Sequence, residues 1–464
     1  MGLHRTQDGQ PPAVPPPQGA VPLIQPAIVA TSRAVRDARD AAAAAAVLVH
    51  EQILGRIDPA LAVRMSITDL KARVAQLVIE LADERRLLLN QQEQEQIAQD
   101  IVDDMVGHGP LEPLLQDQTV SDILVNGAHQ VFIERRGKLV LTDVHFRDDA
   151  HVLRLAQRIA SQVGRRVDQS SPMLDARLAD GSRVNVVIPP LSLKGPCISI
   201  RKFSRTFIDF AQMISLKSAS PELARALEIA ARCRLNILIS GGTGSGKTTL
   251  LNALSGLIDQ GERIVTIEDT AELKLQQHHV VQLESRPQNV EGEGAISQRD
   301  LLRNALRMRP DRIIVGEVRG AEAFDMMQAM NTGHDGSMTT THANSARDAF
   351  ARVETMVMMV SQNVPDVVIR HMLASAIQIV VHCARLSDGT RKLTGISEVT
   401  GVEGDEVVMR EIFVLERKGL DGRGRVQGRF AATGVLPHFL QRIRAHGIRL
   451  ADSIFSEAQE LRER

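Results

Sequence analysis

The sequence predicts an α/β protein whose larger domain contains a mostly parallel sheet covered by helices on both faces. Three observations support this prediction. Short apolar runs typical of buried strands alternate with helical stretches after residue 234, a glycine-rich turn joins the first of these strands to a helix, and carboxylates follow two later strands. Strands alternating with helices build parallel sheets, and the ligands of such sheets lie at the carboxyl ends of the strands.

Composition divides the chain into five segments. The chain has 464 residues, enough for two or three domains with cores of their own. Residues 1–40 are rich in Pro and Ala and predict a disordered tail, and 41–115 show the apolar period of amphipathic helices. These helices form either a bundle that packs on itself or an arm that docks a partner. An α+β domain is expected at 116–205, a linker at 206–220 and the larger α/β domain at 221–464.

The 116–205 segment alternates apolar and polar residues with the period of two that strands show. Asp180-Gly181 separates two such runs, which is typical of a hairpin turn, and Arg136-Gly137 predicts another tight turn. One amphipathic helix is expected at 151–163. The expected strands are 123–126, 131–134, 139–144, 173–178, 184–188 and 197–202.

A phosphate-binding loop follows the apolar run at 235–239 and opens a helix at 250–257. Its glycines let successive backbone N–H groups surround a phosphate, Lys247 reaches the β and γ oxygens, and the Thr248 hydroxyl is a ligand for Mg²⁺. The sequence therefore predicts binding of a nucleoside triphosphate with Mg²⁺. The loop residues are Gly241, Gly242, Thr243, Gly244, Ser245, Gly246, Lys247, Thr248 and Thr249.

Apolar strands and helices continue to alternate around this loop. A helix at 221–233 precedes it. Later strands are expected at 263–267, 312–315, 338–341 and 377–381, with helices at 299–308, 321–330 and 346–359 between them.

Chemical groups follow the ends of three of these strands. Glu268, Asp269 and Glu272 follow the first, where carboxylates suit Mg²⁺ or water positioning, although a solvated acidic turn gives the same pattern. The next strand runs into Glu317 and Arg319, an arrangement in which the acid polarises water or holds the metal indirectly. His334 precedes the third strand and His342 follows it. A lone histidine is commonly structural, but the neighbouring motifs favour a functional His342.

Composition argues against several other classes of protein. Trp and Tyr are absent and the formal net charge is −1, which argues against a base-stacking nucleic-acid groove. Cys197, Cys233 and Cys383 are scattered, as in a reducing cytoplasm, and build neither a disulfide framework nor a four-cysteine zinc site. No apolar run approaches the roughly twenty residues of a membrane span, and the first residues do not resemble a signal peptide.

The order of these motifs resembles the ATPases of type II and type IV secretion systems, and most closely the CpaF-like ATPases of tight-adherence (Flp) pilus assembly. The resemblance covers about residues 100–455, and the absence of a zinc module favours the CpaF-like branch. It rests on the phosphate loop and on the segments 109–115, 125–127, 164–168, 180–185, 200–203, 266–273, 307–320, 332–344, 428–430 and 432–434.

The resemblance implies a RecA-like P-loop NTPase domain preceded by a smaller, PAS-like α+β domain and a helical arm. Such proteins form homo-hexamers in which ATP lies between the two domains, and closure of the domains converts hydrolysis into displacement. Lys247 and Thr248 would hold phosphate and Mg²⁺, and His342 would sense the γ-phosphate. Glu317 and Glu268 would orient or deprotonate water and reach the metal through water; which of them is the base stays open.

Phosphoryl transfer also needs cations to balance the charge of the transferring group. Arg177, Arg183 and Arg201 are candidates from the smaller domain, and each could equally form a surface ion pair. Candidates beside the second carboxylate strand are Arg307, Arg309 and Arg319. Asp269, Glu272, Arg307, Arg319 and His334 are further expected nucleotide-binding residues.

These observations predict an ATP-hydrolysing hexamer at the cytoplasmic face of the inner membrane. It would drive pilus assembly or protein secretion, associate peripherally with the membrane, and contact membrane platform proteins but no nucleic acid. Two alternatives from other classes are a hexameric translocase of nucleic acid and a nucleotide-dependent scaffold with low turnover. Whether the pilus extends or retracts, which pilin or effector is served, and what the first hundred residues do are not determined by the sequence.

Overall fold

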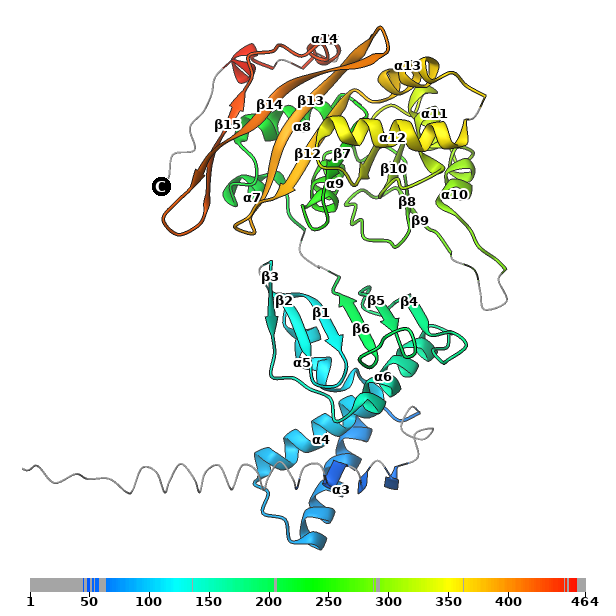
Figure 1. Cartoon of the computed structure of the whole chain (residues 1–464), viewed down its shortest axis with the longest axis vertical. Helices are drawn as coiled ribbons and strands as arrows, with labels where there is room; N and C mark the ends of the chain where they lie inside the picture. The colour runs from blue at the N-terminus through cyan, green and yellow to red at the C-terminus, as the bar shows by residue number, and fades with distance from the viewer. Residues whose placement is uncertain are drawn as a thin grey trace, which may run out of the picture. The chain divides into compact units, whose positions relative to one another are not determined.

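In the computed structural model the chain forms two compact units, Met1–Pro113 and Leu114–Arg464. Figure 1 labels their helices and strands. The predicted tail at 1–40, the first part of the predicted helical arm and Arg136 of the predicted turn lie outside the described residues. The structure describes residues 45, 48–50, 52–53, 55–57, 64–135, 137–203, 207–286, 288, 293–361, 363–445, 447–448 and 450–456.

The first unit contains two amphipathic helices, α3 (Ile67–Arg85) and α4 (Gln91–Val106). The Ser66 side chain caps α3 by accepting a hydrogen bond from the backbone N–H of Asp69, and Asn90 with Glu93 forms a capping box for α4. Buried residues of both helices form one apolar cluster with Val49, Ile53 and Ile57. A short 3₁₀ helix η1 (Gly109–Leu111) and α5 (Glu112–Gln116) follow.

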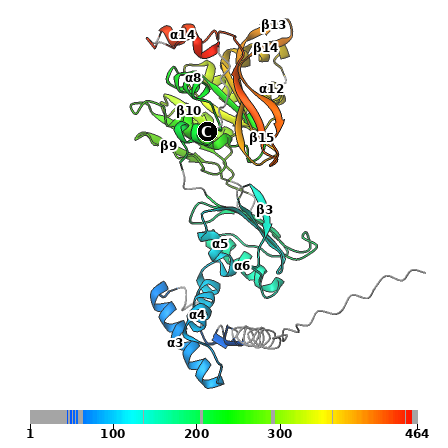
Figure 2. The same cartoon turned by 90° about the vertical axis from the view of Figure 1, so that its left-hand side faces the viewer.

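The second unit begins with a six-stranded antiparallel sheet, here called the N-terminal sheet. Its strand order is β3-β2-β1-β6-β5-β4, and helix α6 (Asp149–Gln162) lies beside it (Figure 2). Buried and exposed residues alternate along its inner strands, as in a sheet packed on one face. The strands are β1 (Val120–Asn126), β2 (Val131–Arg135), β3 (Lys138–Leu141), β4 (Met173–Arg177), β5 (Arg183–Val187) and β6 (Cys197–Arg201).

One row of side chains crosses the less buried face of the N-terminal sheet. Residues paired across neighbouring strands lie on the same face, so the strand register places three arginines and two carboxylates side by side. This row contains the three arginines predicted from this segment. Its members, from β3 to β4, are Leu139, Glu134, Asp122, Arg201, Arg183 and Arg177.

A nine-stranded sheet, here called the central sheet, forms the rest of the unit. Its order is β15-β14-β13-β12-β7-β11-β10-β8-β9, in which β12 to β9 are parallel and β13 to β15 extend the edge antiparallel. The strands are β7 (Ile237–Gly241), β8 (Ile264–Glu268), β9 (Val280–Glu284), β10 (Arg312–Val315), β11 (Met338–Thr341), β12 (Ile379–Arg385), β13 (Arg391–Glu403), β14 (Glu406–Leu420) and β15 (Val426–Ala432).

Helices cover both faces of the central sheet, which confirms the predicted mixed α/β fold. Along β7, Ile237 and Ile239 belong to one apolar core and Leu238 to the other, because successive side chains point to opposite faces. The first core includes α7 (Phe210–Ser215), α8 (Pro221–Arg232), α9 (Lys247–Ser255) and α14 (Leu440–Ala445). The second includes α10 (Gln298–Ala305), α11 (Glu322–Asn331), α12 (Ala346–Val360) and α13 (Asp366–Ala376). A 3₁₀ helix, η2 (Asp452–Phe455), follows α14.

Several elements were not expected from the sequence. Helix α7 lies inside the predicted linker, where Asp209 and Gln212 form a capping box and Phe210 and Met213 are buried. The sequence analysis also missed β9, α13 and the antiparallel strands β13 to β15. Strands β13 and β14 contain irregular pairing positions, so their apolar residues do not keep a period of two along their length.

Candidate functional site

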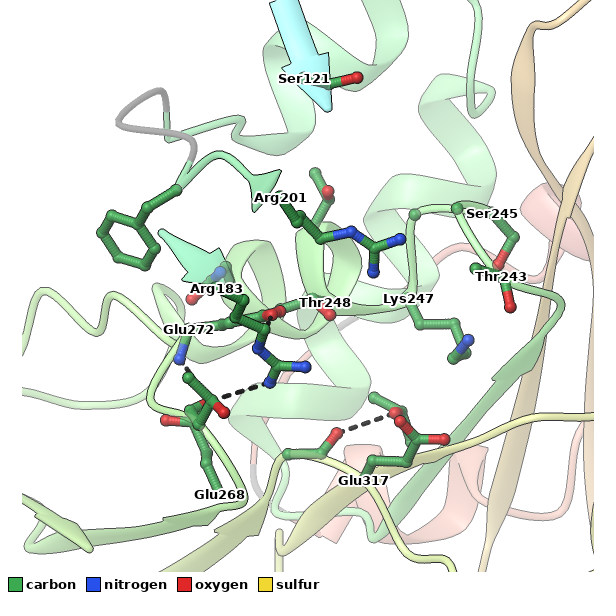
Figure 3. Close-up of a pocket in the computed structure, with 18 of the residues that line it drawn as sticks. Ser121, Arg183, Arg201, Thr243, Ser245, Lys247, Thr248, Glu268, Glu272 and Glu317 are labelled. Carbon is green, nitrogen blue, oxygen red and sulfur yellow. Dashed lines mark hydrogen bonds and ion pairs between the residues drawn. The ribbon is translucent and has the colours of Figure 1, made fainter. Parts of the chain in front are cut away.

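A cavity of about 490 Å³ lies at the carboxyl ends of the parallel strands (Figure 3). The phosphate loop forms one wall, and residues that follow β8, β10 and β11 form another. The N-terminal sheet contributes Asp122, Glu134, Arg183 and Arg201 from its polar row. Most groups predicted from the ends of separate strands therefore meet in one place.

The phosphate loop has the backbone shape that an anion cradle needs. Gly244 and Gly246 have positive φ angles of 68° and 101°, which residues with a Cβ rarely adopt. A Cβ at Gly241 would collide with the carbonyl oxygen of Cys383 and lie 2.5 Å from Ser245 Oγ. Helix α9 begins at Lys247 directly after the loop, so its free N–H groups face the loop. The loop fits a bound phosphate.

Lys247 is buried beneath the loop. Its Nζ donates hydrogen bonds to the carbonyl oxygens of Gly241 and Gly242, each at 3.0 Å. Burial lowers the pKa of Lys247, and the nearby Glu317 carboxylate opposes that shift. The Lys247 ammonium group thus lies against the phosphate loop, where it can bind a phosphate held by the loop.

Glu317 belongs to a chain of charged groups that begins at Lys247. His342 Nε2 lies 3.5 Å from Lys247 Nζ and 3.1 Å from Glu317 Oε1. Arg319 donates a hydrogen bond of 2.8 Å to Glu317 Oε2, and this bond raises the pKa of Arg319. Burial and the Lys247 charge lower the pKa of His342, which favours the neutral imidazole. The Glu317 carboxylate therefore has the cation Arg319 on one side, and on the other side His342, which separates it from Lys247.

Glu268 has a different environment from Glu317. It is only 4% exposed, and its Oε1 accepts hydrogen bonds from the backbone N–H groups of Glu272 (2.9 Å) and Leu273 (3.0 Å). Its Oε2 is buried without a hydrogen-bond partner. Burial raises the pKa of Glu268 to about 7. Gly316 makes this packing possible, since a Cβ there would lie 2.9 Å from the Glu268 Cγ.

Two of the three predicted N-terminal arginines reach the cavity (Figure 3). Arg183 Nε lies 3.0 Å from Glu272 Oε1, and Arg201 lies 3.1 Å from Asp122 on the neighbouring strand. Arg177 is not among the lining residues, because it forms an ion pair of 3.0 Å with Glu284 at the end of β9.

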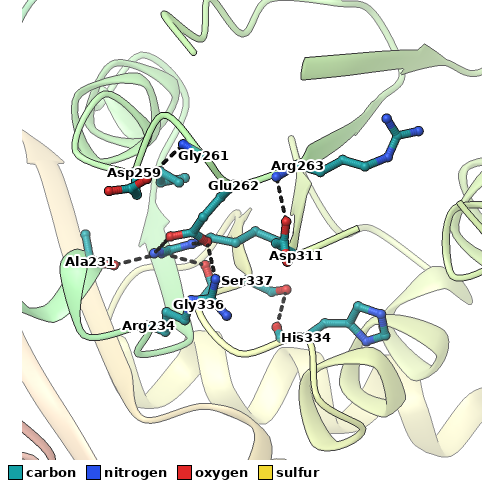
Figure 4. Close-up of polar contacts among 12 residues, drawn as sticks. Ala231, Arg234, Asp259, Gly261, Glu262, Arg263, Asp311, His334, Gly336 and Ser337 are labelled. Carbon is teal, nitrogen blue, oxygen red and sulfur yellow. Dashed lines mark hydrogen bonds and ion pairs between the residues drawn. The ribbon is translucent and has the colours of Figure 1, made fainter. Parts of the chain in front are cut away.

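Two predicted nucleotide-binding regions lie away from the cavity. Arg307 and Arg309 precede β10 and His334 precedes β11, so all three lie near the amino ends of parallel strands whose carboxyl ends face the cavity. The carbonyl of His334 accepts a hydrogen bond from Ser337 at this opposite edge (Figure 4). The structure therefore does not bring these three residues to the phosphate loop.

Buried Arg312 organises this opposite edge of the sheet. It is fully buried and forms two hydrogen bonds with Glu262, of 2.7 and 2.9 Å. It also donates to the carbonyl of Ala231 at 2.7 Å (Figure 4). This network holds the start of the strand that leads to Glu317.

Two arginines that line the cavity, Arg385 and Arg391, were not predicted from the sequence. Arg385 ends β12, which pairs in parallel with β7, and Arg391 begins β13 directly opposite. The rule that located Glu317, a polar residue at the end of an apolar strand, also applies to Arg385. The remaining predicted residues that line the cavity are Thr243, Gly244, Ser245, Gly246, Thr248, Thr249, Asp269, Glu272 and Arg319.

The cavity fits a metal that is held mainly by phosphate and water. Within the described ranges, no group of three or more His, Cys, Asp or Glu residues is arranged to hold a metal ion. The three residues predicted at the metal site, Thr248, Glu268 and Glu317, all line the cavity, where the two carboxylates would hold Mg²⁺ through water. None of the described helices is both long enough and apolar enough to span a membrane.

Comparisons with known proteins agree with this site. The family model described as type II/IV secretion system protein matches residues 104–444. A putative conjugal transfer protein of Mycobacterium tuberculosis strain H37Rv is 39% identical over 307 residues, covering 65% of this chain and 87% of that protein. The type IV secretion system protein VirB11 of Brucella suis biovar 1 is 34% identical over 319 residues, covering 62% of this chain and 88% of that protein.

A solved structure is also similar to this chain. The crystal structure of the VirB11 ATPase from the Brucella suis type IV secretion system, in complex with sulphate, has 32% sequence identity and a TM-score of 0.34. The match covers 62% of this chain and 95% of that chain.

Proposed function

The chain belongs to the type II/IV secretion system protein family, and we propose on this premise that it is an ATPase that drives pilus assembly or protein secretion. The single observation that supports hydrolysis best is the meeting of Lys247, Glu317 and Glu268 in one cavity with the phosphate loop. A loop that only binds nucleotide does not need two carboxylates beside it.

In the proposed reaction the loop N–H groups and Lys247 bind the β- and γ-phosphates. Thr248 would hold Mg²⁺ at the phosphates, directly through its hydroxyl, and the metal would supply positive charge there. Glu317 orients the attacking water and accepts its proton, because its carboxylate faces Lys247 and His342 inside the cavity. The bond from the γ-phosphorus to the bridging oxygen breaks as water attacks, which leaves ADP and inorganic phosphate.

Glu268 acts beside Glu317 in this proposal. Burial raises its pKa to about 7, so its protonated form is favoured far more at neutral pH than that of an ordinary glutamate. The cations Arg183, Arg201 and Arg319 then surround the phosphates and stabilise the charge of the transferring group. His342 lies between Lys247 and Glu317, where it would respond to the γ-phosphate.

Hydrolysis is tested by steady-state ATP turnover over a series of protein concentrations, with Lys247→Ala as the blank. We expect a rate that requires Lys247 and rises with oligomerisation, since a motor of this kind works as a homo-hexamer. Loss of one phosphate-binding cation inside the cavity costs about 10²-fold or more in turnover. Equal rates for the wild type and Lys247→Ala would refute the ATPase.

The same assay separates the two alternatives from other classes. Strong stimulation by DNA or RNA would support a nucleic-acid translocase, and tightly bound nucleotide without turnover would support a scaffold. The composition of the chain, which lacks Trp and Tyr, favours neither stacking of bases nor a nucleic-acid groove.

The finer assignment is a CpaF-like, tight-adherence (Flp) pilus ATPase at the cytoplasmic face of the inner membrane. The motif order and the scattered cysteines support it. We propose peripheral association there through membrane platform proteins. A strain whose chromosomal copy has Lys247→Ala is expected to make the protein but no surface pili. Normal pili in that strain would contradict the assignment to pilus assembly.

A further inference from the structure

The hairpin formed by β12 and β13 places two arginines beside the phosphate loop. Arg385 and Arg391 are directly opposite each other in the antiparallel pair. Like charges in such a pair destabilise a sheet, because the side chains are close together. Both side chains line the nucleotide cavity. The two arginines make different contacts in the free protein: Arg391 bonds the phosphate loop, and Arg385 pairs with the N-terminal sheet.

Arg391 supports the shape of the loop. Its Nε donates a hydrogen bond of 2.8 Å to the carbonyl oxygen of Gly244. A loop carbonyl that is held from outside leaves the loop N–H groups free for phosphate. Its stem also passes close to Gly246, since a Cβ there would lie 3.7 Å from the Arg391 Cδ.

Arg385 instead joins the phosphate loop to the N-terminal sheet. Its Nη1 lies 3.6 Å from Glu134 Oε1 on β2, and its Nη2 donates to the carbonyl oxygen of Gly137 in the β2–β3 turn. The same guanidinium approaches the loop, because Nη1 would lie 3.6 Å from a Cβ at Gly244. The side chain is 29% exposed.

The ion pair between Arg385 and Glu134 is weak enough to exchange. A separation of 3.6 Å is longer than a hydrogen bond, and partly exposed pairs contribute about 0–1 kcal/mol. A phosphate offers several charged oxygens and forms shorter bonds with arginine. An anion in the cavity would therefore compete with Glu134 for Nη1 of Arg385, while Nη2 carries the separate hydrogen bond to the Gly137 carbonyl.

We propose that Arg385 contacts the nucleotide phosphates and leaves Glu134 when it does so, which couples nucleotide occupancy to the β2–β3 edge of the N-terminal sheet. This inference rests on the proposed function, because it concerns the same nucleotide. It adds a residue from β12 to the phosphate site and assigns Glu134 as the competing partner in the free protein.

The test is a double-mutant cycle on the full chain, in which calorimetry measures binding of adenylyl-imidodiphosphate with Mg²⁺. Arg385→Gln should weaken binding about tenfold or more, the loss expected for a hydrogen bond to a charged group. Glu134→Gln should tighten binding by about two- to fivefold, because it removes the competitor. In the double variant that gain should disappear.

Three controls keep the test specific. Arg423→Gln removes an arginine from the β14–β15 turn, outside the cavity lining, and should bind like the wild type. Arg385→Lys keeps the charge and should bind with intermediate affinity. Thermal unfolding without nucleotide shows whether each variant is folded.

The outcomes are distinguishable from failure of the proposed function. Wild-type protein that does not bind the analogue would refute the proposed ATPase. Wild-type protein that binds, together with unchanged affinity in a folded Arg385→Gln variant, would overturn only this inference. The inference is also overturned when the gain from Glu134→Gln persists in the absence of Arg385.

Discussion

Replacement of Glu268 by Gln should make the free protein more stable at alkaline pH. The Glu268 carboxyl is buried, and its pKa is raised from 4.5 to about 7. Folding therefore favours the protonated acid. The stabilisation is complete below the pKa of the unfolded chain and is lost as the pH rises through the pKa of the folded protein.

The size of the effect follows from the two pKa values. A difference of about 2.5 units corresponds to about 3 kcal/mol, of which about 2.5 kcal/mol is lost between about pH 5 and pH 8. Gln resembles the protonated acid in shape, and its oxygen can accept the same two backbone hydrogen bonds. The variant should therefore lack this pH dependence.

The assay is chemical unfolding of wild type and Glu268→Gln across this pH range, without nucleotide. Far-ultraviolet circular dichroism is the suitable probe, because the chain has no Trp or Tyr. Subtracting the free energy of unfolding of the wild type from that of Glu268→Gln at each pH removes the contribution of the other titrating groups, which both proteins share. Glu406→Gln, at an exposed position of β14, is the matched control and should run parallel to the wild type. Parallel curves for Glu268→Gln as well would refute the reasoning from burial.

Three further perturbations test other parts of the structure. Gly241→Ala should lower the melting temperature and abolish nucleotide binding, because its Cβ would collide with β12. Gly242→Ala is the control and should leave the melting temperature unchanged, because a Cβ there meets nothing within 4 Å. Arg312→Met should reduce the free energy of unfolding by about 3–5 kcal/mol, since it removes a fully buried charge partner of Glu262 and leaves that glutamate paired with Arg234 alone. Exposed Arg307→Met should cost less than about 0.5 kcal/mol in the same denaturation assay. Of the three cysteines, only half-buried Cys197 should react with iodoacetamide in the native protein, as mass spectrometry of digested samples can show; rapid labelling of the other two would contradict their burial.

Local sequence patterns were sufficient for the parts of this protein whose structure depends on near neighbours. The glycine pattern and Lys247 located the phosphate loop, because a tight turn between a strand and a helix is specified by the residues within it. The inner parallel strands β7, β8, β10 and β12 were predicted because each is a largely apolar run, which burial on both faces requires. The parallel edge strand β9 was missed, because its residues are only partly buried. Because the carboxyl ends of parallel strands lie at one edge of a sheet, the sequence also predicted correctly that Glu268, Glu317 and His342 lie near the phosphate loop.

Tertiary structure decided which charged residues reach that cavity. Arg177 and Arg183 lie on neighbouring strands of one sheet, yet only Arg183 lines the cavity, because Arg177 is paired with the end of β9. His334 lies four residues before β11, and strand direction places it at the opposite edge of the sheet.

The pKa of Glu268 and the position of Arg385 also depend on tertiary structure. Residues near Glu268 in sequence donate two backbone hydrogen bonds to its carboxyl, but the close packing of Gly316, which follows β10, could not be read from those residues. Arg385 reaches the phosphate loop only because β12 pairs with β7, more than a hundred residues earlier in the chain. The sequence by itself thus determined the chemistry of each strand end, and the order of strands in the sheet determined which of those ends are neighbours, because that order depends on packing between distant segments.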